Sequence, residues 1–267
     1  MKLELNGKRA LITGSNIGIG EAIAKTLANE GVSVVVHGLE KDKVIRVTQE
    51  IEEEGGKAFG VVGDLSTDDG AAYIAKQALE SLGSIDILIN NAGAYKNRGW
   101  MDATADNWAE LYNINVLSVV RLVRHIVPQM KETGWGRIIQ IASGEATQPF
   151  AAMPDYAATK AAQVNLTVSL SQELANTGIT VNTVSPGIVV TETVQEFFHQ
   201  TAKKQGWGSD WNEIEQHILK EFLPNTVGHL GKPKDVANLV AFLSSPLSSY
   251  INGADYRIDG GSTSCIN

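Results

Sequence analysis

Short apolar runs alternate with longer helical patterns along most of the chain. The runs are mostly continuous rather than alternating in polarity, which is typical of strands that are buried on both faces. The expected strands are Arg9–Thr13, Ser33–His37, Phe59–Gly63, Ile85–Asn90, Arg137–Ala142, Thr180–Ser185 and Asp255–Ile258. Helical patterns between the first four strands cover Gly20–Glu30, Asp42–Glu54 and Asp69–Leu82. Because repeated strand–helix–strand units imply right-handed crossovers, the sequence predicts an α/β fold: a single doubly wound, Rossmann-type domain with a seven-stranded parallel sheet and helices on both faces.

Length and composition narrow the class of protein. A chain of 267 residues without a low-complexity linker fits one domain over residues 1–267. The net charge of −8 argues against a nucleic-acid-binding protein. One cysteine, Cys265, allows neither an intrachain disulfide nor a thiolate metal cluster, and the five histidines lack metal-ligand spacing. With no start typical of a signal peptide and no run of about 18 apolar residues, we expect a cytoplasmic protein without a metal, a nucleic-acid partner or a membrane partner.

One segment departs from the alternating pattern. Between about residues 191 and 224 the chain inserts a helical stretch before its last strand. Its aromatic residues are Phe197, Phe198, Trp207, Trp211 and Phe222. A long insertion that follows a strand end is a candidate lid over a substrate. Three uses of the aromatic side chains stay open: contact with a hydrophobic ligand, packing of their own helices, or a subunit interface.

A glycine-rich turn joins the first expected strand to the first helix. It reads Thr13-Gly14-Ser15-Asn16-Ile17-Gly18-Ile19-Gly20. Gly14 allows a tight turn, Gly18 leaves room for a pyrophosphate, and Gly20 permits close packing of the helix on the strand. The helix N-terminus that follows offers free N–H groups and a partial positive charge. The pattern predicts a dinucleotide-binding site, and a tight turn that binds nothing is the alternative.

Polar residues or glycines also follow the other strands of the predicted sheet. They are Asp64 after the third strand, Asn90-Asn91-Ala92-Gly93 at the fourth, Ser143 after the fifth and Pro186-Gly187 after the sixth. In open α/β sheets, ligands bind beyond the carboxyl ends of the strands. We therefore expect these residues to meet at one edge of the sheet and to line a crevice for the nucleotide.

Tyr156 and Lys160 are four residues apart in a helical pattern that follows Pro154, so they lie on one face of a helix. An ammonium ~5 Å from a phenol oxygen, at an effective dielectric constant of ~20, favours the phenolate by roughly 3 kcal/mol, or about two pKa units. We therefore expect the pKa of Tyr156 to fall far enough for proton exchange near neutral pH. A surface pair of tyrosine and lysine without a catalytic role is the alternative.

Taken together, these motifs in this order resemble the short-chain dehydrogenase/reductase family, classical type, over essentially the whole chain. They are TGSNIGIG at 13–20, NNAG at 90–93, Ser143 thirteen residues before the tyrosine, YAATK at 156–160, and NGADYRIDGG, which is similar to the family's last strand and loop. The resemblance implies an NAD(P)-dependent oxidoreductase that transfers hydride between a nicotinamide cofactor and a carbonyl/alcohol substrate. The substrate would be a 3-oxoacyl group or a small-molecule ketone. A homo-oligomer, a tetramer or a dimer, is implied as well, and an apolar helix over Trp108–Met130 is compatible with it.

The resemblance also implies roles for individual residues. Tyr156 would be the general acid/base, Lys160 would lower its pKa and bind the nicotinamide ribose, and Ser143 would hold the substrate oxygen. Asn115 would anchor a water for proton relay, whereas nearby Asn113 is interpreted as a helix-surface amide. Besides Tyr156 and Lys160, the implied cofactor-binding residues are Gly14, Asn16, Ile17, Gly18, Ile19, Gly20, His37, Gly38, Asp64, Leu65, Asn91, Ala92, Gly93, Pro186, Gly187, Ile188 and Thr191.

The end of the second strand leaves the choice between NADP and NAD open. An acidic residue there binds the ribose 2′-hydroxyl of NAD, and a nearby arginine accepts the 2′-phosphate of NADP. By the family's pattern, the position of the acid holds Gly38, and the positions of the basic residues hold Leu39 and Ile17. Since Gly38 leaves room for a phosphate that His37 or Lys41 could meet, we favour NADP over NAD.

The substrate is expected to contact Glu145, Gln148, Phe150, Met153 and Phe197. Two other functions compete with that of an oxidoreductase. A non-catalytic nucleotide-sensing binding module would need neither Tyr156 nor Lys160, so the presence of both residues favours an enzyme. A sugar epimerase or dehydratase of the family's extended branch usually carries a larger C-terminal domain, and few residues follow Lys160 here.

Overall fold

The structure, a computed structural model, describes residues 2–265. Within this range, seven strands form one parallel sheet in the order β3-β2-β1-β4-β5-β6-β7. The strands are β1 (Arg9–Ile12), β2 (Ser33–Gly38), β3 (Lys57–Val62), β4 (Ile87–Asn90), β5 (Gly136–Ile141), β6 (Ile179–Pro186) and β7 (Asp255–Ile258). The strand order reverses between β1 and β4, so the carboxyl ends of these two strands border the crevice of a doubly wound sheet. The predicted fold class is confirmed.

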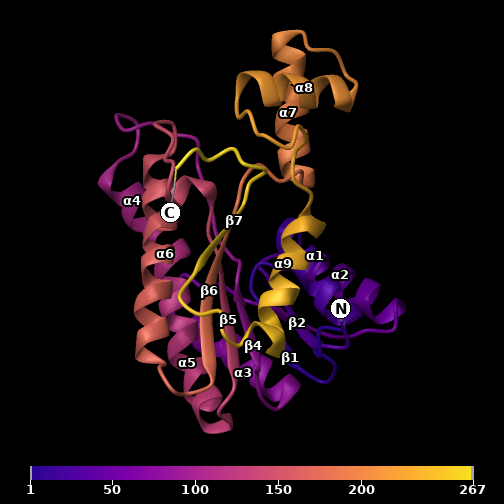
Figure 1. The fold of residues 1–267 in the computed structure, drawn as a ribbon, viewed down its shortest axis with the longest axis vertical. Helices are drawn as coiled ribbons and strands as arrows, with labels where there is room; N and C mark the ends of the chain where they lie inside the picture. Colours follow the sequence, from indigo (N-terminus) through magenta and orange to yellow (C-terminus); the bar gives the residue numbers. More distant parts are fainter. Residues whose placement is uncertain (1, 266–267) are drawn as a thin grey trace.

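Helices cover both faces of the sheet (Figure 1). On one face lie α1 (Gly18–Asn29), α2 (Lys41–Glu53) and α9 (Pro233–Ser244), and on the other lie α3 (Asp68–Leu82), α5 (Ser118–Thr133) and α6 (Pro154–Glu173). Each face has its own buried apolar cluster, because successive strand residues point to opposite faces: Val34 and Val36 belong to one cluster and Val35 to the other. No helix in residues 2–265 has both the length and the hydropathy that a bilayer span requires.

The stretch expected as one helix over Trp108–Met130 is interrupted. The helix α4 (Ala105–Tyr112) is followed by a π-helical turn over Asn113–Leu117, and α5 begins at Ser118. A π turn inserts an extra residue into a helix and often occurs at a functional site. Here it contains Asn115, which is fully buried. The 3.6-residue period of the sequence gives no sign of such a turn.

The helices α7 (Glu192–Gln205) and α8 (Trp211–Glu221) project beyond the carboxyl end of the sheet (Figure 1). They form a small cluster of their own, in which Phe198 and Trp207 are buried. Phe197, by contrast, is 50% exposed. Most aromatic side chains of the predicted insertion therefore pack against their own helices, which was one of the three uses left open.

Candidate active site

The glycine-rich turn after β1 forms a cradle of main chain. Gly14 has a φ of +60°, and a Cβ on it would lie 2.9 Å from the Cα of Ala92. A Cβ on Gly20 would lie 2.3 Å from the oxygen of Gly14. Gly18 lies opposite Thr191, and no side chain caps the N-terminus of α1 at Ile17. Since these N–H groups have no side-chain partner, the cradle fits a phosphate-bearing ligand.

The segment after β4 holds this turn in place. Nδ2 of Asn91 donates to the main-chain oxygens of Thr13 and Gly14, both at 2.9 Å. Oγ1 of Thr13 accepts from the N–H groups of Asn91 at 3.0 Å and Ala92 at 2.9 Å. The side chain of Asn91 therefore shapes the nucleotide site by fixing the turn.

His37 and Gly38, at the end of β2, depart from the expectation. The ring of His37 is 3% exposed; its Nδ1 accepts from the N–H of Gly14 at 3.2 Å, and Nε2 contacts the oxygen of Gly63 at 3.0 Å. Burial lowers the pKa of His37, so the ring is neutral near pH 7 and Nε2 is the donor. A Cβ on Gly38 would lie 2.3 Å from the side chain of Asn16. The prediction that the His37 ring meets a phosphate beside Gly38 is wrong. The ring is hydrogen-bonded to the segments that follow β1 and β3, and the side chain of Asn16 occupies the space next to Gly38.

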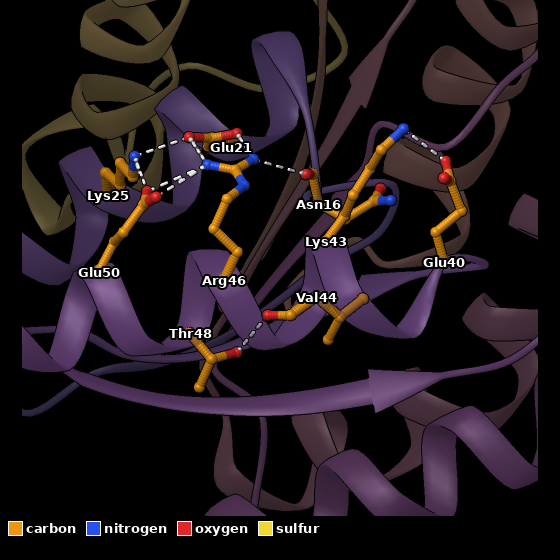
Figure 2. A network of polar contacts seen from close by, with 9 residues as sticks. All are labelled: Asn16, Glu21, Lys25, Glu40, Lys43, Val44, Arg46, Thr48 and Glu50. Carbon is orange, nitrogen blue, oxygen red and sulfur yellow. Dashed lines mark hydrogen bonds and ion pairs between the residues drawn. The ribbon is translucent and has the colours of Figure 1, made fainter.

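Arg46 reaches from α2 to the glycine-rich turn (Figure 2). Its Nη2 donates to the main-chain oxygen of Asn16 at 3.2 Å, and its guanidinium pairs with Glu21 at 2.7 Å and Glu50 at 3.1 Å. Lys25 contacts the same two carboxylates at 2.6 Å. The two positive and two negative charges balance, and together they fix α2 against the turn. Sequence reasoning missed Arg46, because a contact with a main-chain oxygen 30 residues away leaves no local pattern.

The loop after β3 carries Asp64 and Leu65. Both carboxylate oxygens of Asp64 accept from Ser66, from its N–H and its hydroxyl at 2.8 Å each, and these bonds lower the pKa of Asp64. Leu65 is buried beside it. Nδ2 of Asn113 donates to the oxygen of Ser66 at 2.8 Å, and its Oδ1 accepts from Arg121 at 2.8 Å. Asn113 therefore fastens this loop to the π turn.

The ends of β5 and α6 bring Ser143 and Tyr156 together. Ser143 precedes a short 3₁₀ turn over Gly144–Ala146, and its Oγ accepts from the N–H of Glu145 at 3.2 Å. The same hydroxyl lies close enough to the phenol of Tyr156, in the first turn of α6, to lower the pKa of that phenol. A serine hydroxyl that accepts from the main chain keeps its own hydrogen to donate. This pair can therefore stabilise negative charge on a bound oxygen.

Lys160 lies one helical turn after Tyr156 and is 4% exposed. Its Nζ donates to the oxygen of Ile141 at 2.8 Å and to Oε1 of Gln163 at 2.9 Å, and it lies 5.6 Å from the centroid of the Tyr156 ring. Burial lowers the pKa of Lys160 to about 7. Burial also raises the pKa of Tyr156, against the lowering effect of the nearby Ser143 hydroxyl. The expected fall in the pKa of Tyr156 from Lys160 alone is therefore wrong, because burial penalises both charges.

The oxygen and both N–H hydrogens of the Asn115 side-chain amide, in the π turn, are hydrogen-bonded. Its Oδ1 accepts from the N–H of Ala94 at 2.8 Å, and Nδ2 donates to the oxygen of Ala94 and to Oγ1 of Thr159, both at 2.9 Å. Its main-chain oxygen accepts from Nε2 of Gln163 at 2.9 Å. A Cβ on Gly93 would lie 3.2 Å from Oδ1 of Asn115 and 3.6 Å from Nζ of Lys160. Asn115 thus joins the loop after β4 to α6, and its amide has no hydrogen left for the expected relay water.

A buried ion pair that sequence reasoning missed fixes the start of α6. Asp155 is 0% exposed, and its Oδ2 lies 2.8 Å from Nε of Arg98. Its Oδ1 accepts from the N–H of Tyr156 at 2.9 Å, and Arg98 also donates to the oxygen of Asn107 on α4 at 3.2 Å. The pair therefore holds the turn that carries Tyr156 against α4. The sequence did contain one signal for this pair, because Asp155 is an acidic residue in the first turn of a helix.

A cavity of about 100 Å³ lies beside Ser143. Three predicted substrate residues line it: Glu145, Gln148 and Phe150. Met153 and Phe197 do not line it. The other lining residues are Gly144, Pro186, Gly187, Ile188, Leu223, Ser262 and Thr263, of which Leu223, Ser262 and Thr263 carry side chains that sequence reasoning missed. A larger cavity of about 390 Å³ lies at the amino ends of β5 and β6, next to Trp135 and Arg137, and none of the predicted site residues lines it.

Comparison with known proteins decides the family. The family model for short chain dehydrogenase matches residues 8–202. This chain belongs to the short-chain dehydrogenase family. It is therefore an enzyme of the oxidoreductase class, and the resemblance inferred from its motifs is confirmed. A relative, the uncharacterized oxidoreductase YvaG of Bacillus subtilis (strain 168), is 38% identical over 264 residues, which cover 98% of each chain.

Two solved structures of related enzymes contain both a cofactor and a substrate-like ligand. The L-sorbose reductase from Gluconobacter frateurii, complexed with NADPH and L-sorbose, superposes with a TM-score of 0.94 at 33% identity and full coverage of both chains. A 7α-hydroxysteroid dehydrogenase complexed with NADH and 7-oxo glycochenodeoxycholic acid superposes with a TM-score of 0.87 at 33% identity, over 100% of this chain and 98% of that one. The family fold thus serves both cofactors and ligands of very different size.

Proposed function

We propose that this short-chain dehydrogenase uses NAD(P) to interconvert small polar ketones and their alcohols, with Tyr156 as the general acid/base. The observation that carries the proposal is that Ser143 lines a cavity at the carboxyl ends of the strands, with the Tyr156 phenol near its hydroxyl and Lys160 one turn further along α6. A nucleotide-sensing module would have no need of this arrangement. The solved relatives, with NADPH or NADH bound, support the cofactor class.

The main-chain cradle fits the dinucleotide. The N–H groups at the start of α1 and the turn at Gly14 and Gly18 would hold the pyrophosphate, with Thr191 on its far side. When bound, the nicotinamide supplies the hydride for reduction or accepts it in oxidation. The positive charge of its oxidised form would add to that of Lys160 and favour the Tyr156 phenolate, which burial alone disfavours.

The protein's own side chains would bind the oxygen of the ketone and transfer one proton to it. In reduction, the ketone oxygen would accept hydrogen bonds from Ser143 and Tyr156, and Tyr156 would donate its proton as negative charge develops there. Lys160, with its pKa lowered to about 7, exchanges protons near neutral pH and can help to restore the phenol. No metal is required for these steps.

The cavity favours one of the two substrate classes left open by the sequence. A volume of about 100 Å³ suits a small ketone better than a long acyl chain, and Ser143, Gln148 and Thr263 supply polar groups among apolar lining residues. The L-sorbose reductase supports the same choice. NADP remains our prediction over NAD, since no acidic residue ends β2 and Lys41 stays exposed. The cytoplasmic location and the homotetramer or dimer also stay predictions.

The proposal is tested by fluorescence titration with NADPH and NADH, followed by a panel of ketones and alcohols with the preferred cofactor. We expect NADPH to bind more tightly and small polar ketones to be reduced. Failure to bind either cofactor would count against the whole proposal. Tight binding without turnover of any carbonyl compound would support the nucleotide-sensing alternative.

A further inference from the structure

Glu145 is a buried acid, and one of its two carboxylate oxygens lacks a hydrogen-bond partner in the part of the chain that the structure describes. It is 8% exposed, and its Oε2 has no hydrogen-bond partner within residues 2–265. Asp155, the other acid near Tyr156, is neutralised by Arg98 at 2.8 Å. An unpaired polar atom in the interior costs free energy, and burial raises the pKa of Glu145 to about 7. A ligand group in the adjoining cavity would supply the missing partner.

The position of Glu145 relative to the catalytic groups is fixed by the 3₁₀ turn. Its N–H donates to Oγ of Ser143 at 3.2 Å, and its carboxylate is close enough to Tyr156 to raise the pKa of the phenol. The other polar side chains that line the cavity are neutral: Gln148, Ser262 and Thr263. A substrate group that meets Glu145 would therefore lie near the carbonyl held by Ser143 and Tyr156, among uncharged side chains.

We propose that Glu145 is a specificity-determining residue that hydrogen-bonds a substrate hydroxyl near the reacting carbonyl, so that hydroxyketones and the matching polyols are the preferred substrates. The proposal rests on the proposed function, since Ser143 and Tyr156 must hold the carbonyl. A hydroxyl suits both states of the carboxyl, because it donates to the carboxylate and accepts from the acid. Sites that hydrogen-bond a substrate hydroxyl discriminate strongly against analogues without it.

The test compares kcat/KM for 1-hydroxy-2-butanone and 2-butanone in the wild type and in Glu145→Leu and Glu145→Gln. We expect the wild type to prefer the hydroxyketone by about 100-fold or more. Glu145→Leu should lose most of this preference, and Glu145→Gln, which keeps hydrogen-bonding atoms, should retain part of it. Glu173→Gln removes an exposed carboxylate at the far end of α6 and should keep the wild-type ratio.

Equal kcat/KM for the two ketones in the wild type would overturn the proposal, and so would an unchanged ratio in Glu145→Leu. Thermal melting checks the fold of each variant, and Glu145→Ala replaces Glu145→Leu if the latter does not fold. Failure of the proposed function is a different result: no carbonyl compound would be turned over in a manner that depends on Tyr156.

A second inference comes from Gln163, a buried amide one turn after Lys160. It is 1% exposed; its Oε1 accepts from Nζ of Lys160 at 2.9 Å, and its Nε2 donates to the main-chain oxygen of Asn115 at 2.9 Å. The side chain therefore links α6 to the π turn. It bridges Lys160 and the main-chain oxygen of Asn115, two groups to which the expected relay water could have bound. The other hydrogen-bond acceptor of Lys160, the oxygen of Ile141, is also neutral.

We infer that Gln163 is a positioning residue that holds Lys160 without a charged partner. The titratable groups around Lys160 are Tyr156 on the preceding turn of α6 and, next to that phenol, Glu145 on the 3₁₀ turn and Tyr95 on the loop after β4. A neutral amide does not offset the burial that lowers the pKa of Lys160. The identity of residue 163 therefore influences the pH at which Lys160 loses its proton.

The test is the pH profile of kcat/KM in Gln163→Glu. A carboxylate beside Lys160 favours the ammonium, so we expect the alkaline limb to move up by about one to three pH units. Gln163→Met removes the side-chain oxygen that accepts from Lys160, so the alkaline limb should move to lower pH. This variant provides the test if Gln163→Glu does not fold. Gln172→Glu makes the same change on the exposed face of α6 and should leave the profile unchanged. Altered melting temperatures with wild-type profiles in both Gln163 variants would show a merely structural role.

Discussion

Replacing Tyr156 with phenylalanine is expected to lower kcat for carbonyl reduction by about 10²- to 10⁴-fold, the range that general acid–base catalysis contributes. Phenylalanine keeps the ring that packs edge-on against Tyr95, with centroids 6.0 Å apart. Only the phenol hydroxyl near Ser143 and its transferable proton are lost. Because the glycine-rich turn would carry most of the cofactor binding, the Kd for the cofactor should change far less than turnover. Steady-state kinetics and fluorescence titration measure the two effects.

Tyr73→Phe is the matched control. Tyr73 is 52% exposed on α3, outside the predicted site, so its variant should keep wild-type kcat and wild-type cofactor binding. A Tyr156→Phe enzyme with wild-type turnover would exclude the phenol as the proton donor.

Replacing Arg98 with alanine is expected to lower the free energy of unfolding by about 3–5 kcal/mol, because it leaves a buried charge without its partner. Asp155 is 0% exposed and pairs with Arg98 at 2.8 Å. The same carboxylate accepts from the N–H of Tyr156, so kcat should fall as well, since the first turn of α6 loses its anchor. Urea denaturation gives the stability change, and steady-state kinetics give the change in activity.

Lys131→Ala is the control for this prediction. Lys131 pairs with Glu173 at 3.5 Å, and both side chains are largely exposed, so the loss should stay below about 1 kcal/mol. In the double variant Arg98→Met/Asp155→Leu, most of the lost stability should return, because no unpaired charge remains. A loss below 1 kcal/mol in Arg98→Ala would mean that Asp155 finds another partner or water.

Features that are local in the sequence were predictable. Continuous apolar runs such as Val34–Val36 predicted buried parallel strands, since only strands covered on both faces can be apolar throughout. The glycines of the turn predicted a main-chain cradle, because Gly14 and Gly20 sit where a Cβ would overlap other atoms. The four-residue spacing placed Tyr156 and Lys160 on one face of α6.

Features that depend on burial or distant contacts were not predictable. The sequence gives the identity of His37 and Gln163 but not their partners, which come from other elements of the fold. The electrostatic argument for Tyr156 assumed a partly solvated pair, whereas burial in the structure dominates the pKa of both groups. Arg46 and Arg98 act through contacts at long sequence separation, with Asn16 and Asp155 respectively.

The central claim is that Tyr156 protonates the oxygen of a ketone whose carbon receives hydride from the nicotinamide. A single turnover with the reduced cofactor carrying two deuterium atoms at C4 and a small hydroxyketone, followed by mass spectrometry of the alcohol, tests it directly. The wild type is predicted to place deuterium on the carbinol carbon, and Tyr156→Phe to form far less of this product while still binding the cofactor. An alcohol without deuterium, or the same yield from Tyr156→Phe, would contradict the account.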